Sequence, residues 1–325
     1  MKTKNVFKLM AILIAVVGIN IAGCKKDHST STSTTPDTSS LSQLAKDDSQ
    51  VQASDDEISN DANATLSSSS AKSMDTLPVI NSCTITVDTV GATKDTLQIT
   101  LLYTGFNTGH NFSRTGTVVI TRPLGVQWKT QGCAVTFKYI QLAVTKVSTG
   151  KTFMFDGTRT WTNISGGLIK NLNGSSATVT HQITGQMQIT FDYGTANSST
   201  RTWYIYRQRV WGGTFPTALT VTVSGFGSNS GYSNLVEYGT NRNGEPFFSS
   251  INTPILYDYN TCIAYQFVPI WGSLTHQIPS ANKSATLTFG YTSSGTLVTQ
   301  GSCATYYLLS YNIKGTTGTI LLPIL

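Results

Sequence analysis

The sequence is short of charge. Asp, Glu, Lys and Arg make up 12% of its 325 residues, whereas soluble domains average about 25%. Long surface helices take their solvent-facing residues from these four types, so the scarcity argues against a helical protein. Only one long apolar run exists, and the mean hydropathy is −0.05, which excludes several transmembrane helices. The abundant residues are Thr, Ser and Gly, with 14 Tyr, and this composition favours strands and turns.

Groups that carry chemistry are also few. From residue 77 onward the chain has seven carboxylates and three histidines, and no CxxC, HExxH or G-x-S-x-G motif. We therefore expect no metal, no cofactor and no enzymatic activity. The least unfavourable catalytic pair is Glu237 and Glu245, which flank an Asn/Gly-rich loop. A hydrolase using these two carboxylates, which would have to lie about 5–9.5 Å apart, is kept as an alternative.

The N-terminus predicts export. Lysines at positions 2, 4 and 8 precede an apolar run from Leu9 to Gly18, followed by Ile21-Ala22-Gly23-Cys24. A basic start, a short apolar core and small residues are typical of a secretory signal, and the run is too short for a transmembrane helix. The final tetrad resembles the bacterial lipobox. The resemblance implies a signal peptide over 1–23 and a lipid on Cys24, whose acyl chains would anchor the protein to a membrane; an ordinary signal peptide is the alternative.

Two further segments resemble known lipoproteins. Lys25-Lys26-Asp27 is similar to the charged export tag of Bacteroidota surface lipoproteins. In the C-terminal half, the order of Asn243-Gly244, Cys262, the strand-like 286–291 and Cys303 resembles uncharacterised Bacteroidota lipoproteins. The resemblance implies an outer-membrane location and a β architecture; it implies no activity, and it leaves the membrane leaflet open.

Residues 24–76 are rich in Ser, Thr, Asp and Ala and predict a disordered tether after the lipidated cysteine. Four apolar residues could share one face of a transient helix, namely Leu41, Leu44, Val51 and Ile58. Asp48 and Asp55 interrupt that face, so we expect no folded helix. The tether has a net charge of −5 and residues 77–325 one of +8. Either the tether's acids keep it solvated, or the basic body faces an anionic partner; nucleic acid is not expected.

Residues 77–325 predict an all-β body. Period-two alternation of Thr with Val, Ile, Leu or Phe recurs between clusters of Gly, Asn and Ser, for example over 96–101, 186–191 and 219–223. Short strands at this spacing are typical of a β-sandwich-like fold. One or two lobes are compatible with the pattern, and a seam between two lobes would fall near 225–244.

The cysteines predict disulfides. With Cys24 assigned to the lipid, four remain, an even number in an exported protein. We expect Cys262 to pair with Cys303 and Cys83 with Cys133, although four cysteines allow three connectivities. A zinc site is the competing interpretation.

One segment, 201–211, has the composition of a binding strand. As a strand it places Trp203, Arg207, Arg209 and Trp211 on one face, and Tyr204, Tyr206, Gln208 and Val210 on the other. Aromatic rings stack on sugars and Arg binds anions, so the first four residues are candidate ligand contacts. The competing interpretation is that the tryptophans belong to the core and the Arg stems cover them.

The sequence thus predicts a lipid-anchored envelope lipoprotein with a non-catalytic binding or structural role. A glycan or an envelope protein is the expected partner besides the membrane. The first alternative is a component of polysaccharide capture, and the second is the hydrolase.

Overall fold

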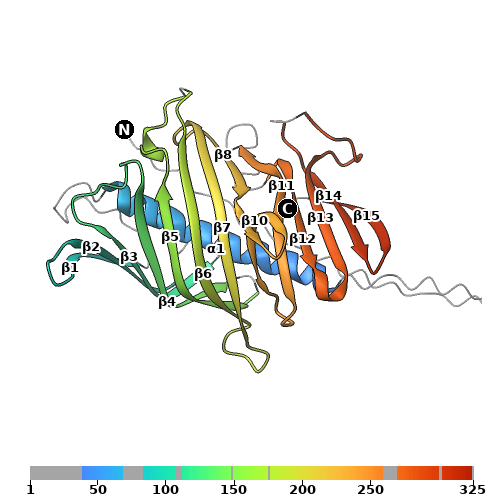
Figure 1. Ribbon diagram of the computed structural model, residues 1–325, viewed down its shortest axis with the longest axis horizontal. Helices are drawn as coiled ribbons and strands as arrows, with labels where there is room; N and C mark the ends of the chain where they lie inside the picture. The colour runs from blue at the N-terminus through green and yellow to red at the C-terminus, as the bar shows by residue number, and fades with distance from the viewer. Residues whose placement is uncertain are drawn as a thin grey trace, which may run out of the picture.

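The computed structural model describes residues 39–68, 83–106, 112–147, 149–174, 176–258, 269–299 and 302–323. Over this part of the chain it consists of one α-helix, two 3₁₀ turns and fifteen strands (Figure 1). The helical elements are α1 (Ser39–Ser68), η2 (Ile169–Asn171) and η4 (Pro279–Ala281). The strands are β1 (Cys83–Val90), β2 (Thr96–Phe106), β3 (Phe112–Pro123), β4 (Cys133–Lys146), β5 (Thr152–Asn163), β6 (Val179–Phe191), β7 (Ser199–Thr214), β8 (Ala218–Gly225), β9 (Gly227–Asn229), β10 (Tyr232–Thr240), β11 (Pro246–Asp258), β12 (Trp271–Ile278), β13 (Lys283–Tyr291), β14 (Tyr306–Ile313) and β15 (Thr316–Pro323).

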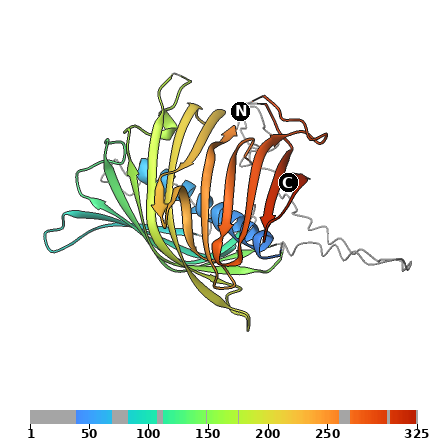
Figure 2. The ribbon, with the colours of Figure 1, turned by 45° about the vertical axis from the view of Figure 1, so that its right-hand side comes forward.

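The all-β prediction for the body is confirmed. All fifteen strands belong to one antiparallel sheet, in which β1 to β7 follow one another in chain order and β10 to β15 continue the series. The predicted alternation is visible in the burial of each strand: along β4 and β7, buried and less buried residues alternate. The second layer, which a sandwich would supply with another sheet, is here the helix α1 (Figure 2).

The sheet continues without a break through residues 225–244, where the sequence placed a seam. The first half of β7 pairs with β10, and its second half, from Arg207 to Thr214, pairs with β8. β11 pairs with the same two strands. β8 and β10 therefore share one position in the sheet, between β7 and β11, and join its two halves.

Glycines allow the long strands to bend. Gly116 of β3 has a φ of 120° and lies where the register with β4 shifts. A Cβ at this position would approach the carbonyl oxygen of Gln141 to 2.3 Å. Gly157 of β5 has a φ of 131°, and a Cβ there would lie 2.5 Å from the carbonyl oxygen of Gln186. Bulges of this kind increase the bend of a strand, and the sheet curves around α1 (Figure 2).

The helix α1 crosses the sheet and fills its inner face. Its 30 residues extend about 45 Å. Near its N-terminus, the Ser40 hydroxyl accepts a hydrogen bond from Lys283 of β13, and near its C-terminus Asp61 binds Arg114 of β3. Its buried apolar residues belong to the main core cluster, and each buried Leu, Val or Ile side chain contributes roughly 1.5–3 kcal/mol. They are Leu41, Leu44, Val51, Ile58, Ala62 and Leu66.

The prediction of a disordered tether is therefore wrong for residues 39–68. The two acids that appeared to interrupt the apolar face, Asp48 and Asp55, are both buried against the sheet. Asp55 forms an ion pair with Arg159 of β5, and Asp48 lies 3.8 Å from the Nε2 of His276 in β12. Basic partners on the sheet thus convert an interrupted apolar stripe into a continuous contact surface. Residues 24–38 and 69–76 of the predicted tether lie outside the described residues. No helix among the described residues is both long and apolar enough to cross a membrane.

The predicted Cys83–Cys133 disulfide is wrong, because both cysteines are free. Cys83 begins β1 and Cys133 begins β4, and β2 and β3 lie between these strands in the sheet. Neighbouring strands are about 4.8 Å apart, so three spacings exceed the roughly 7 Å that a disulfide allows between Cα atoms. Cys303 is disulfide-bonded. Cys262 lies outside the described residues, so its pairing with Cys303 stays a prediction.

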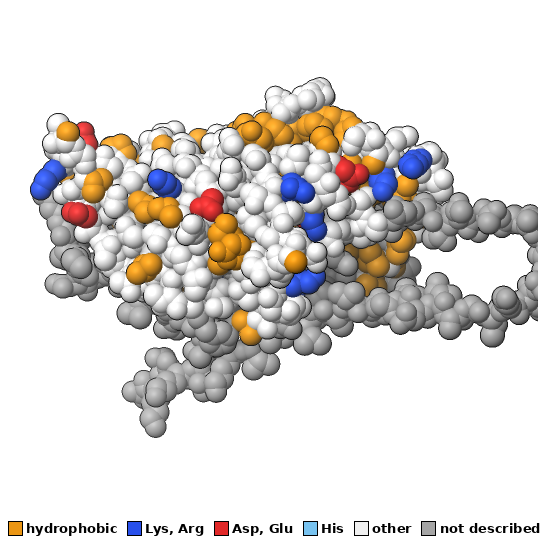
Figure 3. Space-filling model, turned by 90° about the horizontal axis from the view of Figure 1, so that it is seen from below, with side chains coloured by type: hydrophobic (Ala, Val, Ile, Leu, Met, Phe, Trp, Pro, Cys, Tyr) orange, Lys and Arg blue, Asp and Glu red, His pale blue; other side chains and the backbone are white. Residues whose placement is uncertain are grey.

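The surface has the low charge that the composition requires. On the face shown in Figure 3, most of the described surface is backbone and side chains that are neither charged nor hydrophobic, a few Lys, Arg, Asp and Glu side chains are scattered, and hydrophobic side chains form groups.

Candidate functional site

The four predicted ligand contacts of the 201–211 segment are buried. The predicted faces of β7 are correct, but the face with Trp203, Arg207, Arg209 and Trp211 is the inner one, and all four residues are buried. Trp203 is fully enclosed and donates its indole N–H to the carbonyl of Thr240 at 2.8 Å. These side chains therefore hold the fold together, and none of them presents a surface to a ligand.

The opposite face of β7 carries a row of aromatic rings that continues across the neighbouring strands. Tyr204 of β7 lies directly opposite Tyr238 of β10, which in turn lies opposite Phe248 of β11. The Tyr204 and Tyr238 rings stack with centroids 4.8 Å apart, and the Tyr238 and Phe248 centroids are 6.2 Å apart. Tyr206 stacks on Tyr238 at 5.9 Å, and its hydrogen bond with Tyr238 raises the pKa of Tyr206.

Two further rings extend the row at its ends. Phe226, which is 40% exposed, meets Tyr206 edge-on, with centroids 6.0 Å apart. Tyr232 stacks on Phe248 at 4.3 Å. Except for Phe226, which is exposed, the rings of the row are partly buried. Aromatic pairs of this kind contribute about 0.5–1.5 kcal/mol beyond their buried area, so the ring contacts stabilise this face while leaving part of each ring accessible.

Glutamine side chains adjoin the aromatic row on the same face. Gln186 of β6 pairs in register with Tyr204, and Gln182 with Gln208, to which it donates a hydrogen bond of 3.0 Å. Gln186 and Gln188 are exposed. We call this surface the aromatic–amide face; its members are Tyr204, Tyr206, Phe226, Tyr232, Tyr238, Phe248, Gln182, Gln186, Gln188 and Gln208. Sequence reasoning missed it because its rings come from several strands whose pairing the sequence does not show, although Tyr204 and Tyr206 were already assigned to one face.

The face is free of charge over its central strands. The outward positions of β6 from Gln182 to Gln188, and those of β7 from Thr202 to Gln208, carry only Gln, Thr and Tyr. Amide and hydroxyl groups donate and accept hydrogen bonds without ionic attraction, and aromatic carbon contacts apolar C–H surfaces. A ligand that offers both hydroxyls and C–H faces suits such a surface.

The inner face holds a separate, buried polar cluster beneath α1. The Ser249 hydroxyl of β11 and Nδ1 of His276 form a hydrogen bond of 2.8 Å, and Ser249 also donates to Glu237 of β10 at 3.5 Å. Burial lowers the pKa of His276, which the Asp48 carboxylate partly offsets. Burial and the nearby Asp48 raise the pKa of Glu237 well above its ordinary value.

This cluster contains the groups of a serine–histidine–acid triad without access for a substrate. Ser249, His276 and Glu237 are each at most 1% exposed, and Asp48, which completes the set, belongs to α1 and is 5% exposed. A nucleophile that attacks a substrate needs an open position beside it. The cluster instead holds α1 against the sheet, because Asp48 of α1 lies beside His276. Arg207 adjoins the cluster, and its guanidinium lies 3.9 Å from Glu237.

The two glutamates of the hydrolase alternative do not share a cleft. Glu237 faces α1 from the middle of β10 and is buried. Glu245 lies in the turn between β10 and β11, where its carboxylate accepts a hydrogen bond from the Asn241 amide at 2.8 Å. The side chain of Asn241 in turn accepts from the backbone N–H of Asn243 and Glu245, so this carboxylate stabilises a turn.

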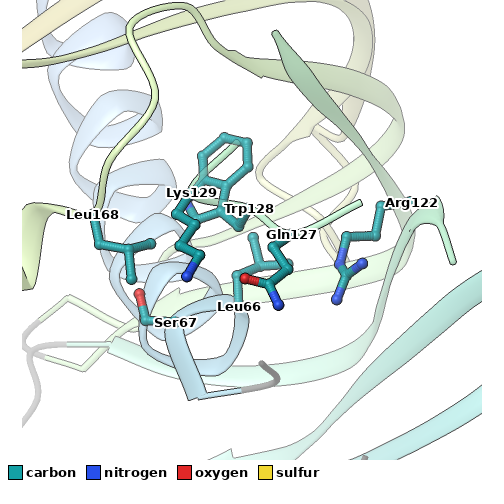
Figure 4. A pocket seen from close by; sticks show the side chains of 7 residues that line it. All are labelled: Leu66, Ser67, Arg122, Gln127, Trp128, Lys129 and Leu168. Atoms are coloured by element: carbon teal, nitrogen blue, oxygen red, sulfur yellow. The ribbon is translucent and has the colours of Figure 1, made fainter. Parts of the chain in front are cut away.

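A small pocket lies at the C-terminal end of α1 (Figure 4). Its interior volume is about 20 Å³, whereas a single water molecule needs about 10–15 Å³, so the pocket is too small for an organic ligand. Its lining combines apolar and basic side chains: Leu66, Ser67, Arg122, Gln127, Trp128, Lys129 and Leu168. Arg122 is already engaged, because it donates to the carbonyls of Pro123 and Val126. Among the described residues, no group of three or more His, Cys, Asp or Glu side chains is arranged to hold a metal.

Comparison of the chain with protein-family models, curated proteins and solved structures finds no match.

Proposed function

We propose that this chain is a lipid-anchored lipoprotein of the bacterial outer membrane with a non-catalytic binding role, and that its aromatic–amide face binds an uncharged glycan. The anchor rests on the signal-like N-terminus and on Cys24 at the end of its lipobox-like tetrad. The observation that carries the glycan is the continuous row of rings beside exposed glutamines, on a part of the sheet where the outward positions of β6 and β7 carry no charge and Asp156 of β5 lies at the edge, opposite Gln188.

Chemistry favours a neutral sugar over other ligands. Nucleic acids and acidic glycans are bound chiefly through Lys and Arg, which the outward positions of the central strands lack. Sugar rings expose C–H patches between hydroxyls, so they use aromatic carbon and side-chain amides together. The stacking of Tyr238 between its neighbours fixes the rings before binding, and this preorganisation reduces the entropy lost when a ligand binds.

The glycan is tested by replacing single members of the face. We expect the chain to bind neutral oligosaccharides on a glycan array, and Tyr238→Ala to weaken that binding about tenfold, equivalent to about 1.4 kcal/mol. Gln186→Ala removes an amide without disturbing the ring stack and should also weaken binding. Tyr193→Ala is the matched control, because Tyr193 is 45% exposed in the turn after β6, outside the face.

The glycan proposal fails if the array shows no binding, or if Tyr238→Ala and Tyr193→Ala bind equally well. Preference for uronic acid or phosphate-bearing sugars would contradict the argument from charge. The anchor is tested separately, by labelling cells with radioactive palmitate. The chain should carry the label and Cys24→Ser should lose it, whereas label retained by that variant would refute the anchor.

A further inference from the structure

The last two strands lie beyond the part of the sheet that α1 covers. α1 begins at Ser39, and its first contacts with the sheet include Lys283 of β13. β14 and β15 follow on the far side of β13 (Figures 1 and 2). The helix α1 therefore covers the inner face of the sheet only as far as β13, and β14 and β15 extend beyond it.

The inner face of these two strands is apolar. Ile313 of β14 is buried in the main core, so Tyr311, Leu309 and Tyr307 share its side of the strand by alternation. In the register with β15, Leu309 lies opposite Ile320 and Tyr307 opposite Leu322. We call this surface the terminal face; its members are Tyr307, Leu309, Tyr311, Ile320 and Leu322.

None of these five side chains is buried. Ile320 is 42% exposed, the other four are partly buried, and no residue of β15 reaches the buried class. Leu309 and Tyr311 pack against the main core cluster and Tyr307 against a second one, whereas Ile320 and Leu322 belong to neither cluster. These two side chains are therefore the part of the terminal face that is open to a partner. The presence of two tyrosines among aliphatic residues suits a boundary between an apolar and an aqueous phase, because the ring is apolar and the hydroxyl is polar.

The charge around the terminal face points to a particular partner. The chain has no Asp or Glu after Asp258, so its last 67 residues carry no acidic side chain. Two lysines lie in this region: Lys283 in β13 and Lys314 in the exposed turn between β14 and β15. A bilayer surface is commonly anionic, and it attracts Lys and repels carboxylates.

The chain that leads from the proposed anchor ends beside the same face. Fourteen residues separate Cys24 from Ser39, where α1 begins. They can span at most about 50 Å. With α1 seated on the sheet and Cys24 in a membrane, the N-terminal end of α1 and the neighbouring strands stay within that distance of the bilayer.

We propose that the terminal face docks on a phospholipid bilayer, with Ile320 and Leu322 entering the headgroup region and Lys314 facing anionic headgroups. The proximity argument rests on the proposed anchor at Cys24; the apolar and charge arguments do not. Docking would hold the anchored body in one orientation on the membrane.

The test uses the chain from residue 25 to 325, which includes every described residue and carries no lipid. Vesicles of phosphatidylethanolamine and phosphatidylglycerol at 3:1 are floated through a sucrose gradient with the protein. We expect the chain to float, and Ile320→Asp with Leu322→Asp to lower the vesicle-bound fraction at least tenfold. Leu124→Asp is the matched control and should float normally, because Leu124 is 46% exposed in the connection after β3.

A second variant covers the case in which the double variant does not fold. Lys314→Glu leaves the apolar side chains intact and should weaken binding to phosphatidylglycerol vesicles more than to pure phosphatidylcholine vesicles. The proposal is wrong if the unchanged chain stays at the bottom of the gradient, or if both variants float as well as the control. It is also wrong if light scattering shows a dimer without vesicles that the double variant converts to a monomer, because a second copy then covers the face. Since the tested chain has no lipid, this result is independent of palmitate labelling at Cys24.

Discussion

Replacing Asp55 by Asn tests whether α1 is part of the fold. The carboxylate of Asp55 is 4% exposed and Arg159, its partner on β5, is 1% exposed. The hydroxyl of Tyr139 also donates to Asp55, at 3.3 Å. Asn keeps the size of the side chain and removes its charge, so the variant leaves the Arg159 guanidinium buried without its counter-ion.

The expected loss in the free energy of unfolding is about 3–5 kcal/mol, because removing one partner of a buried pair strands the other charge in an apolar interior. That is a large share of the roughly 5–15 kcal/mol that a folded domain has in total. Urea unfolding followed by tryptophan fluorescence measures it. Asp88→Asn, at an exposed position of β1, is the charge-matched control and should change the free energy by at most about 0.5 kcal/mol.

A double variant, Asp55→Leu with Arg159→Leu, sharpens the test. Replacing both members of a buried pair by apolar residues is often neutral or stabilising, so the double variant should recover most of the stability that Asp55→Asn loses. If Asp55→Asn proves as harmless as Asp88→Asn, residues 39–68 do not pack on the sheet. The reasoning about the inner face is then wrong.

Three further outcomes follow from the buried groups. Glu237→Gln should leave the free energy of unfolding at pH 7 unchanged or raise it, because burial and Asp48 already favour the protonated carboxyl, which Gln resembles; a loss above about 2 kcal/mol would contradict this. Burial, and to a lesser extent Arg209, lowers the pKa of His181 in the folded chain to about 3. In the unfolded chain the same imidazole has a pKa near 6.5, so between pH 6.5 and 3 it is protonated in the unfolded chain and neutral in the folded one. Stability should therefore fall as the pH drops below 6.5, by up to about 1.4 kcal/mol per pH unit from this group, and His181→Phe should reduce the loss between pH 7 and 5 in urea titrations. Burial raises the pKa of the Cys83 thiol to about 11, so iodoacetamide at pH 8 should modify this thiol slowly in the folded chain. If the chain is unfolded with iodoacetamide and without reductant, mass spectrometry should find both Cys83 and Cys133 alkylated. A disulfide between them would refute the strand order.

The strands could be predicted because their signal is local. Alternation along β7 is contained in the residues themselves, so the division into a Trp/Arg face and a Tyr/Gln face was correct. Which face lies inside depends on what covers the sheet. Arg207 and Arg209 suggested a surface, but both are buried: Arg207 lies beside Glu237 of the adjacent strand β10, and Arg159 on the same inner face pairs with Asp55 of the distant helix.

The helix and the aromatic–amide face could not be predicted for a related reason. Asp48 and Asp55 looked like interruptions because the partners of their carboxylates are distant: Tyr139, which donates to the Asp55 carboxylate, is 84 residues away. Tyr238 and Phe248 join Tyr204 only through strand pairing across β10. The wrong Cys83–Cys133 pairing has the same origin, since spacing along the chain does not reveal that two strands separate them.

The packing of α1 on the inner face of the sheet also limits the order in which the chain can fold. α1 is made first, yet Arg242, which holds Asp47, follows it by 195 residues. Contacts this distant in sequence form late and slowly, and a chain is synthesised at roughly 5–20 residues per second. The segment that closes the core therefore has no complete partner until the last third of the protein exists. For the export proposed above, the consequence is that the core cannot close around α1 before most of the chain has been made.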